Sequence, residues 1–420
     1  MRTCSHTVII GGGLAATTLV EEVRKHGVDD AISIVSDEIH LPYDRPPLSK
    51  RALREDPADI GEYALRPAEW AEQMRVDFML GSPAMGWDPS SRLVHLSGGR
   101  QVHFDRLIVA TGAQARVLEA APPGGQVHYL RNWSDVQALH QCLADNPGGR
   151  LLIVGAGFIG LEVASSMLER DIEVVEIVEA GPRPLSRVLP DALAELCWRP
   201  YQDARIPLST GTALSGIETT PRGVTATLSD GRRIDCELVV VAAGSVPNTA
   251  WAAGLEYGPD GAIVCDGSGR SSVDGVWALG DAAAWPNPYV DTIRRIEHWQ
   301  AAIDQAAVVA ADLAGAGAES WGSAPYFWSD LLGGRVQLVG EAPATATTHT
   351  ATRGERTVTV IRRGDTVAGV FARRRPRAMI AGRALLGSDM SALEAQAWCD
   401  RTVGVPHQPG KKREFDVQAS

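Results

Sequence analysis

The sequence predicts an α/β protein organised around two βαβ units of the Rossmann type. Two stretches carry this prediction, because each combines a short apolar strand, a glycine-rich turn, a helical pattern and a second strand near an acidic residue. The first glycines of the two turns, Gly11 and Gly155, are 144 residues apart. The composition agrees, since 45% hydrophobic residues with 43 Gly and 25 Pro are typical of a globular α/β chain.

The first unit occupies the N-terminal residues. Its parts in order are an apolar strand at 7–10, a G-x-G-x-x-A array formed by Gly11, Gly13 and Ala16, a helix to about His26 and a strand at 31–35. Asp37 lies 24 residues after Gly13, near the place where an acid binds the ribose of a dinucleotide. The start of the chain superficially resembles a signal peptide, but the βαβ unit explains the same residues better.

A proline-rich loop follows the first unit. Residues 41–50, LPYDRPPLSK, contain three prolines, which predicts a stiffened loop. Such a loop could hold Arg45 and Lys50 against an anionic cofactor, and a solvated basic loop is the alternative. Strands are then expected at 76–80, 92–96 and 100–104, with a hairpin turn at 97–99, and a buried strand with small residues at its end at 107–112.

The second unit carries the complete glycine pattern. An apolar run at 151–154 predicts a buried parallel strand, and Gly155, Gly157 and Gly160 follow it in a G-x-G-x-x-G array. Gly155 permits the tight turn, Gly157 lets the backbone approach a pyrophosphate, and Gly160 allows close packing of helix and strand. These residues predict a dinucleotide site.

The remainder of the second unit supports the same interpretation. A helix expected at about 158–170 offers free N–H groups and a positive dipole end to phosphates. A strand at 173–178 ends at Glu179, whose carboxylate can bind a ribose hydroxyl and repel a 2′-phosphate, which favours NADH. Arg183 lies nearby and could soften that preference. Two such units imply two nucleotides, usually FAD and a nicotinamide nucleotide, unless one unit is a structural repeat without ligand.

A matching series of strands follows the second unit. A hairpin is expected at 224–228 and 232–236, an apolar strand at 238–244, and a break at 245–248 that leaves the inserted domain. The segment 275–281, GVWALGD, places Asp281 after a strand and a glycine. This carboxylate could accept hydrogen bonds from a sugar-like hydroxyl chain, and the alternative is an N-cap for a following helix.

Composition excludes several classes of function. The net charge of −11 argues against nucleic-acid binding. The six cysteines form no C-x-x-C pair, which fits reduced cytoplasmic thiols better than disulfides or a metal site. No apolar run approaches the roughly 20 residues that span a bilayer.

Ten motifs in order make a more specific resemblance. They are VIIGGGLAA, LPYDRPPLSK, LIVATG, YLRNWSD, IVGAGFIGLEVA, VEA, GSVPN, ALGD, RIEHW and PYFWSD. Together they resemble the FAD-dependent NADH:ferredoxin reductases of bacterial cytochrome P450 and dioxygenase systems, the putidaredoxin reductase-like family. The resemblance implies a glutathione reductase-like fold. Its expected parts are an FAD domain at 1–115 and 247–320, an NAD domain at 116–246 and a C-terminal α+β domain at 321–420.

The resemblance also implies site residues. It places Lys50 beside the flavin with Glu162 as its ion-pair partner, and the lysine would stabilise negative charge on the reduced flavin. Phe158 matches an aromatic residue over the nicotinamide pocket, with ordinary packing as the alternative. The remaining cofactor-binding positions are Gly11, Gly13, Leu14, Ala15, Ala16, Asp37, Arg45, Ala84, Ala110, Thr111, Gly112, Arg131, Gly155, Gly157, Ile159, Gly160, Glu179, Gly244, Gly280, Asp281, Glu297, His298 and Trp299.

Electron transfer is expected to need no redox cysteine. The C-x-x-x-x-C of disulfide reductases is absent after the first unit, and residues 44–65 contain no cysteine. FAD is therefore expected to be the sole internal redox centre. It would take hydride from NADH and release single electrons to an iron–sulfur partner.

The C-terminal region offers candidates for contact with that partner. It begins with the aromatic residues Trp321, Tyr326, Phe327 and Trp328, and strands are expected at 336–339, 357–361 and 367–371. Trp328 matches an aromatic at the partner-facing edge, and core packing is the alternative. Arg373, Arg374 and Arg375 could steer an acidic ferredoxin, or lie on a solvated hairpin. Residues 306–308, Ala-Ala-Val, depart from the basic residues that family members often carry there.

The leading hypothesis is thus an NADH:[2Fe–2S] ferredoxin reductase that serves a cytochrome P450 or related oxygenase. A second is an NADH oxidase or reductase that delivers electrons to oxygen, a quinone or rubredoxin. A third is a redox-sensing interaction protein. A cytoplasmic monomer or weak dimer is expected, without metal, membrane or nucleic acid.

Overall fold

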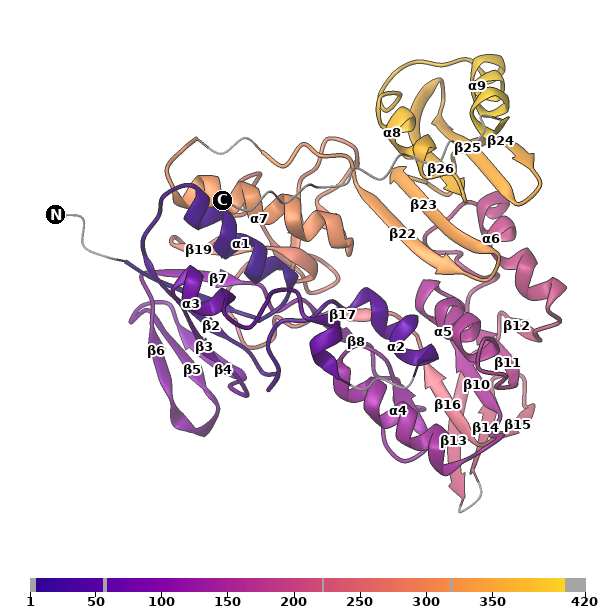
Figure 1. Ribbon diagram of the computed structural model, residues 1–420, viewed down its shortest axis with the longest axis horizontal. Coiled ribbons are helices and arrows are strands. Elements are labelled where there is room, and N and C mark those ends of the chain that lie inside the picture. Colours follow the sequence, from indigo (N-terminus) through magenta and orange to yellow (C-terminus); the bar gives the residue numbers. More distant parts are fainter. Residues whose placement is uncertain (1–4, 56–58, 221–222, 318–319, 405–420) are drawn as a thin grey trace, which may run out of the picture.

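The computed structural model describes residues 5–55, 59–220, 223–317 and 320–404. Figure 1 shows three lobes: one formed by the N-terminal third together with α7, one formed by the middle of the chain, and a C-terminal lobe that rests on the middle one. Within these ranges no helix is long and apolar enough to cross a membrane.

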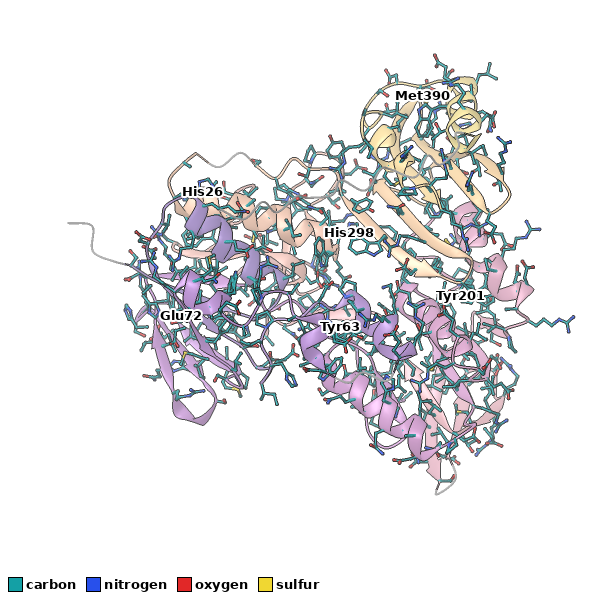
Figure 2. All side chains as sticks on the ribbon, viewed as in Figure 1. His26, Tyr63, Glu72, Tyr201, His298 and Met390 are labelled. Carbon is teal, nitrogen blue, oxygen red and sulfur yellow. The ribbon has the colours of Figure 1, made fainter. Side chains whose placement is uncertain are left out.

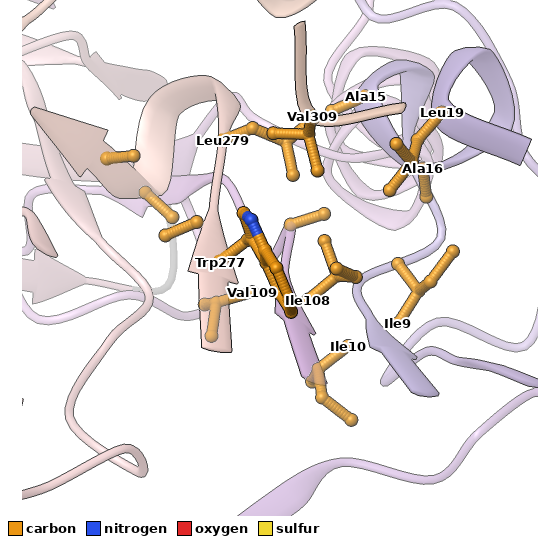
Figure 3. Close-up of a cluster of buried hydrophobic side chains, with 14 of the residues drawn as sticks. Ile9, Ile10, Ala15, Ala16, Leu19, Ile108, Val109, Trp277, Leu279 and Val309 are labelled. Carbon is orange, nitrogen blue, oxygen red and sulfur yellow. The ribbon is translucent and has the colours of Figure 1, made fainter. Parts of the chain in front are cut away.

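The first lobe is built on a parallel sheet in the order β19-β7-β1-β2-β3. Its strands are β1 (His6–Ile10), β2 (Ala31–Val35), β3 (Val76–Met79), β7 (Arg106–Val109) and β19 (Val276–Ala278). Helices α1 (Leu14–Lys25) and α7 (Trp299–Leu313) pack together on it. Figure 3 shows this core, in which Trp277 lies near Ile108 and Val109. A small antiparallel sheet of β4 (Ala84–Asp88), β5 (Leu93–Leu96) and β6 (Gln101–His103) adds to the same core.

The middle lobe repeats this plan. Its parallel sheet has the order β12-β11-β10-β16-β9, and an antiparallel sheet β13-β14-β15 packs against it. The strands are β9 (Val127–Tyr129), β10 (Leu151–Val154), β11 (Val174–Glu179), β12 (Leu208–Thr210), β13 (Leu214–Thr220), β14 (Gly223–Leu228), β15 (Arg233–Cys236) and β16 (Leu238–Val241). The helices are α4 (Trp133–Asp145), α5 (Phe158–Leu168) and α6 (Asp191–Asp203).

The chain passes between these lobes through one antiparallel pair. β8 (Ala113–Ala115) leads into the middle lobe and β17 (Ser245–Pro247) leads back, with Ser245 opposite Ala115. Because β19 then pairs with β7, the first lobe contains two segments of the chain.

The C-terminal lobe is an antiparallel sheet in the order β22-β23-β26-β25-β24. Its elements are β22 (Tyr326–Leu331), β23 (Gly334–Gly340), β24 (Thr347–Arg353), β25 (Arg356–Arg363), β26 (Thr366–Arg373), α8 (Arg377–Arg383) and α9 (Ala392–Gly404). β22 lies against α5 and α7, so this lobe closes over both others (Figure 1).

Short elements complete the chain. They are the 3-10 turns η1 (Pro46–Ser49), η2 (Ile60–Tyr63), η3 (Ser97–Gly99) and η4 (Gly280–Ala282), helices α2 (Arg51–Arg54) and α3 (Trp70–Met74), and strands β18 (Ile263–Val264), β20 (Ala283–Trp285) and β21 (Arg294–Arg295). The structure therefore places a strand, β20, directly after η4. The N-cap alternative for Asp281 was wrong, because Asp281 lies inside the 3-10 turn η4, whose cap position is Leu279, and a strand rather than an α-helix follows.

Candidate functional site

A cleft of about 1320 Å³ runs between the lobes and is lined by both glycine-rich turns. Residues from the first turn, the proline-rich loop, the second turn and β22 all face it. In Figure 2, His298 lies where the first lobe approaches the C-terminal sheet, and it lines the same cleft. The two predicted dinucleotide sites thus open into one space.

The first turn has the geometry that a dinucleotide needs. Gly11 has a φ of +111°, and a Cβ there would lie 2.1 Å from the Ala110 carbonyl oxygen, so only glycine fits. Gly13 precedes α1, and a Cβ on it would meet nothing within 4 Å. The backbone at Gly13 is therefore open to the cleft, where the first N–H groups of α1 can bind phosphate.

The second turn repeats this arrangement with closer packing. Gly155 has a φ of +108°, and a Cβ there would lie 2.4 Å from the Ala242 carbonyl oxygen. A Cβ on Gly160 would lie 2.0 Å from the Gly155 carbonyl oxygen, so α5 lies directly against its own turn. Gly157 is open, and it faces the cleft with Phe158 and Ile159.

The acidic residues that follow the second strand of each βαβ unit have different surroundings. Glu179 lines the cleft, and its two carboxylate oxygens accept hydrogen bonds from the backbone N–H of Ala156 at 2.8 Å and of Gly181 at 2.7 Å. Asp37 is exposed and lies on the cleft wall. Its neighbour Glu38 accepts a hydrogen bond from Arg45 at 2.6 Å and one from Tyr43 at 2.5 Å.

The proline-rich loop places the Lys50 side chain against the middle lobe. Lys50 Nζ lies 2.9 Å from Glu162 Oε2, and both side chains are largely buried, at 12% and 3% exposed. Lys50 also donates to the Pro46 carbonyl oxygen at 3.0 Å. This pair joins residues that are 112 positions apart and places an ammonium group in the cleft wall.

Asp281 and Arg131 form a second ion pair in the cleft. Arg131 Nη2 donates to Asp281 Oδ2 at 2.7 Å, while its Nε donates to the Ala113 carbonyl oxygen at 2.8 Å. The pair therefore ties η4 to the strand that leaves the first lobe. A carboxylate and a guanidinium that line one cleft suit a ligand that carries both hydroxyl and phosphate groups.

Aromatic side chains close the third side. Phe327 on β22 lies 4.8 Å from the Phe158 ring and 5.2 Å from the His298 ring, between centroids. Trp328 meets Trp299 edge to face at 5.8 Å, and Trp299 Nε1 donates to Asp44 Oδ1 at 2.9 Å. Trp328 lines the cleft, so it is not solely a core residue.

Burial perturbs two of these groups. It lowers the pKa of His298 to about 4, and the buried Nδ1 of this ring has no hydrogen-bond partner among the residues that the structure describes. Burial also raises the pKa of Asp44, although the Trp299 hydrogen bond and the charge of Lys50 oppose that shift. The ring of His298 is therefore neutral at neutral pH.

The other predicted site residues divide into two groups. Most line the cleft: Leu14, Ala15, Ala84, Ala110, Thr111, Gly112, Gly244, Gly280, Asp281, Glu297, His298 and Trp299. Ala16, Gly155 and Gly160 shape the two turns from behind. Ala306, one of the three residues that stand where family members often carry basic residues, is buried in α7 and faces the core.

The basic run after β26 lies elsewhere. Arg373 pairs in register with Val336, at the end of the sheet opposite Tyr326, and donates to the Leu196 carbonyl oxygen. Arg374 forms an ion pair with Glu355 at 2.9 Å, and Arg375 is buried. None of these three arginines lines the cleft.

The structure adds residues that the sequence did not single out. Arg187 lines the cleft, with its guanidinium 3.7 Å from where a Cβ of Gly244 would lie. Ser329 donates to Glu162 Oε1 at 2.5 Å. Arg187 could have been noticed as a cation eight residues after Glu179, whereas no local pattern marks Ser329 within PYFWSD.

The thiols in the described ranges lie away from the cleft. Cys142, Cys197, Cys236, Cys265 and Cys399 are free and buried, and none lines the cleft. Burial raises the pKa of Cys197 to about 12, which keeps this thiol protonated. In the same ranges no group of three or more His, Cys, Asp or Glu side chains could hold a metal ion. Cys4 falls outside the described residues.

The donor set of the cleft fits two dinucleotides. Each turn offers open backbone N–H groups at a helix start, which suits a diphosphate. Asp37 and the Arg131–Asp281 pair flank the first turn, while Glu179 and Arg187 flank the second. Lys50, Phe158, Phe327 and Trp328 line the same cleft as the two turns.

Comparison with protein families gives two matches. Residues 5–306 match the model described as pyridine nucleotide-disulphide oxidoreductase. Residues 326–405 match the model described as reductase C-terminal.

Relatives of known activity align along most of the chain. Rhodocoxin reductase of Rhodococcus erythropolis is 34% identical over 398 residues, 93% of this chain and 91% of that protein. The benzene 1,2-dioxygenase system ferredoxin–NAD(+) reductase subunit of Pseudomonas putida is 33% identical over 345 residues, 80% of this chain and 81% of that protein.

Two solved structures superimpose on most of the chain. The ferredoxin reductase for the CYP199A2 system from Rhodopseudomonas palustris superimposes with a TM-score of 0.86 at 28% identity, over 93% of this chain and 97% of that one. The covalent putidaredoxin reductase–putidaredoxin complex gives 0.83 at 27% identity, over 95% and 99%. The chain therefore belongs to the pyridine nucleotide-disulphide oxidoreductase family, and it is an oxidoreductase whose two dinucleotides are FAD and NAD(H).

Proposed function

We propose that this protein takes electrons from NADH and passes them one at a time to a [2Fe–2S] ferredoxin that serves a cytochrome P450 or related oxygenase. The observation that carries the proposal is the shared cleft, in which both glycine-rich turns meet beside the Lys50–Glu162 pair with no thiol in its described lining. Such a cleft suits direct transfer between two cofactors. When bound, FAD supplies the conversion between a two-electron donor and one-electron transfers.

The residues of the cleft divide the work. The first turn, with Asp37, Arg45, Arg131 and Asp281, would hold FAD. Arg45 and Arg131 are themselves held by Glu38 and Asp281, so both guanidinium groups would be in position when FAD binds. The second turn, with Phe158 and Glu179, would hold the nicotinamide nucleotide. Lys50 would then stabilise the negative charge that reduction brings to the cleft.

Several contacts favour NADH over NADPH. Glu179 places a carboxylate beside the second turn, where it repels a 2′-phosphate. Arg183, the nearby cation that could offset this effect, forms an ion pair with Asp191 and donates to the Leu189 carbonyl oxygen. The described partners of Arg183 are therefore groups other than Glu179.

The acceptor is inferred from relatives that share the whole architecture. Rhodocoxin reductase and the dioxygenase-system reductases align over most of the chain, and the putidaredoxin reductase–putidaredoxin complex shows such a fold bound to its partner. Trp328, at the cleft, is the favoured aromatic on the route to the partner. Steering by Arg373, Arg374 and Arg375 stays a prediction, and none of the three lines the cleft. We also propose that the protein acts in the cytoplasm as a monomer or weak dimer.

Anaerobic stopped-flow spectroscopy tests the proposal. The FAD-loaded protein is first reduced with NADH and then mixed with a panel of [2Fe–2S] ferredoxins, with rubredoxin, a quinone and oxygen as competing acceptors. Re-oxidation that is fastest with a ferredoxin, together with reduction of that ferredoxin, is the expected result. Re-oxidation by oxygen or a quinone alone would replace the proposal with an NADH oxidase or quinone reductase.

A further inference from the structure

The carboxylate of Glu162 is held by all three lobes. Its Oε2 atom lies 2.9 Å from Lys50 Nζ and accepts a hydrogen bond from Ser49 Oγ at 2.5 Å. Its Oε1 atom accepts a hydrogen bond from Ser329 Oγ at 2.5 Å. Ser49 and Lys50 come from the proline-rich loop, Glu162 from α5 and Ser329 from β22. Ser329 is only 1% exposed, so water does not compete for this hydrogen bond.

Matching spacings explain how β22 reaches this carboxylate. Phe327 and Ser329 lie on the same face of a strand, about 7 Å apart. Phe158 and Glu162 lie one turn apart on α5, about 6 Å along its axis. Phe327 contacts Phe158 at 4.8 Å while Ser329 contacts Glu162, so the strand and the helix are fixed at two consecutive points.

The Ser329 hydroxyl donates a hydrogen bond to Oε1, the carboxylate oxygen of Glu162 that is not the one paired with Lys50. A buried carboxylate is stable when donors surround both of its oxygens, and charge-assisted hydrogen bonds are the strong ones. Without Ser329, Oε1 would lose its described donor and draw on the nearest cation. That cation is Lys50, whose ammonium group would then move toward Oε1 and away from the cleft.

We propose that Ser329 is a positioning residue, which holds Glu162 so that Lys50 presents its charge to the cleft. Through this contact the C-terminal lobe sets the reduction potential of the bound flavin. The inference rests on the proposed function, because it takes the flavin ring to lie beside Lys50. It does not depend on the identity of the electron acceptor.

The test is the midpoint potential of bound FAD, measured by anaerobic titration against a reference dye with no ferredoxin present. In Ser329→Ala the Lys50 charge recedes and Glu162 is less neutralised, and both effects oppose a negative charge on the reduced flavin. The expected change is a fall of about tenfold in the equilibrium constant for two-electron reduction, or about 30 mV. Ser329→Thr keeps the hydroxyl and should keep the native potential.

Two controls separate this role from a structural one. Tyr201→Phe removes another buried hydroxyl between the same two lobes. Tyr201 accepts a hydrogen bond from the Leu332 N–H at 3.1 Å and donates to the Leu161 carbonyl oxygen at 2.8 Å, but none of its described hydrogen bonds reaches Glu162, so this change should leave the potential unchanged. In a Glu162→Gln background, Ser329→Ala should produce no further fall. If Ser329→Ala fails to fold, Ser329→Cys, with a weaker donor of similar size, carries the same expectation of a lower potential.

Three outcomes would overturn the inference: a native potential in Ser329→Ala or Ser329→Cys, an equal fall in Tyr201→Phe, or an undiminished fall in the Glu162→Gln background. Failure of the proposed function looks different. In that case no ferredoxin would accept electrons from the wild-type protein, while the potentials of the Ser329 variants would still shift.

Discussion

The two glycine-rich turns bend the backbone in nearly the same way. The φ values of Gly11 and Gly155 are +111° and +108°, and each N–H donates at 2.7 Å to the carbonyl oxygen of an adjacent parallel strand. Each leaves the next glycine of its array open to the cleft. This similarity shows that strand, turn and helix produce the same backbone geometry at both turns.

The difference lies in what surrounds each turn. The first helix tolerates Ala16 at the third position of the array, whereas the second requires Gly160, because α5 lies against its own turn. Around the first turn, Arg45 and Arg131 are paired with Glu38 and Asp281, while Asp37 is exposed. Beside the second turn, Arg187 is exposed. The two arginines of the first site are thus held by acidic partners, whereas Arg187 of the second site is open to solvent.

The largest expected effect tests the third position. Gly160→Ala places a Cβ 2.0 Å from a backbone oxygen that cannot rotate away, so it should lower the free energy of unfolding by about 3 kcal/mol and abolish reduction by NADH. The converse change, Ala16→Gly, should cost about 1 kcal/mol through helix propensity and leave NADH reduction intact. Chemical denaturation and anaerobic reduction measure both. Equal effects of the two changes would refute the asymmetry.

The next effect is a loss of stability at low pH, which depends on a buried histidine of the first lobe. Burial lowers the pKa of His298 to about 4 in the folded state, against about 6.5 in the unfolded chain. As pH falls, the unfolded state therefore binds the proton first, so the stability is full above about pH 7 and is lost toward pH 4. His298 should account for a fall of about 2 kcal/mol in unfolding free energy between pH 7 and pH 5.

Comparison of the wild type with His298→Gln across this pH range isolates that contribution. His128, on β9 of the middle lobe, is also buried with a lowered pKa, so His128→Gln should act in the same direction there. A pH dependence that is identical in the wild type and His298→Gln would show that this ring is not kept neutral by burial.

Replacement of Glu179 tests how the second site selects NADH over NADPH. Glu179→Ala removes an acceptor for the N–H groups of Ala156 and Gly181 and a carboxylate beside the ribose site, so the KM for NADH should rise about tenfold, or about 1.4 kcal/mol. The ratio of the KM values for NADPH and NADH should narrow. Glu176→Ala on the same strand, outside the cleft, is the control. An unchanged ratio in Glu179→Ala would exclude this residue as the selector.

The smallest expected effect concerns two arginines that are four residues apart. Arg187→Ala should raise the KM for NADH about fivefold, or about 1 kcal/mol, because it removes a cation from the second half of the cleft. Arg183→Ala should leave KM unchanged, because Arg183 is held by Asp191. Steady-state kinetics at two ionic strengths measures both, and a larger effect of Arg183→Ala would reverse the assignment.

Local patterns made the turns predictable. Glycine spacing specifies both φ values and close approaches within a few residues, and the expected strands at 31–35, 76–80 and 151–154 form within a residue of those bounds. The helix expected to about residue 170 ends at Leu168. Asp281 was ambiguous, because the small apolar residues after it, Ala282 to Ala284, suit either a helix or a strand.

Contacts between distant segments were not predictable from local patterns. The Lys50–Glu162 pair came only from the family resemblance, since 112 residues separate its members. The position of Ser329 depends on how β22 docks on α5, and no spacing within the sequence encodes that contact. The basic run at Arg373 suggests a docking surface from charge alone, and local patterns did not indicate that Arg373 would donate to the Leu196 carbonyl oxygen or that Arg374 would pair with Glu355.

Both dinucleotides are expected to meet in one cleft, with the flavin as the sole redox centre among the described residues. An anaerobic titration of the FAD-loaded protein with NADH measures how many electrons the protein accepts. One equivalent of NADH per flavin should bleach the flavin completely, and a second equivalent should remain unoxidised, because the described cysteines are free and lie away from the cleft. Consumption of two equivalents, or a flavin that NADH does not bleach, would contradict the account.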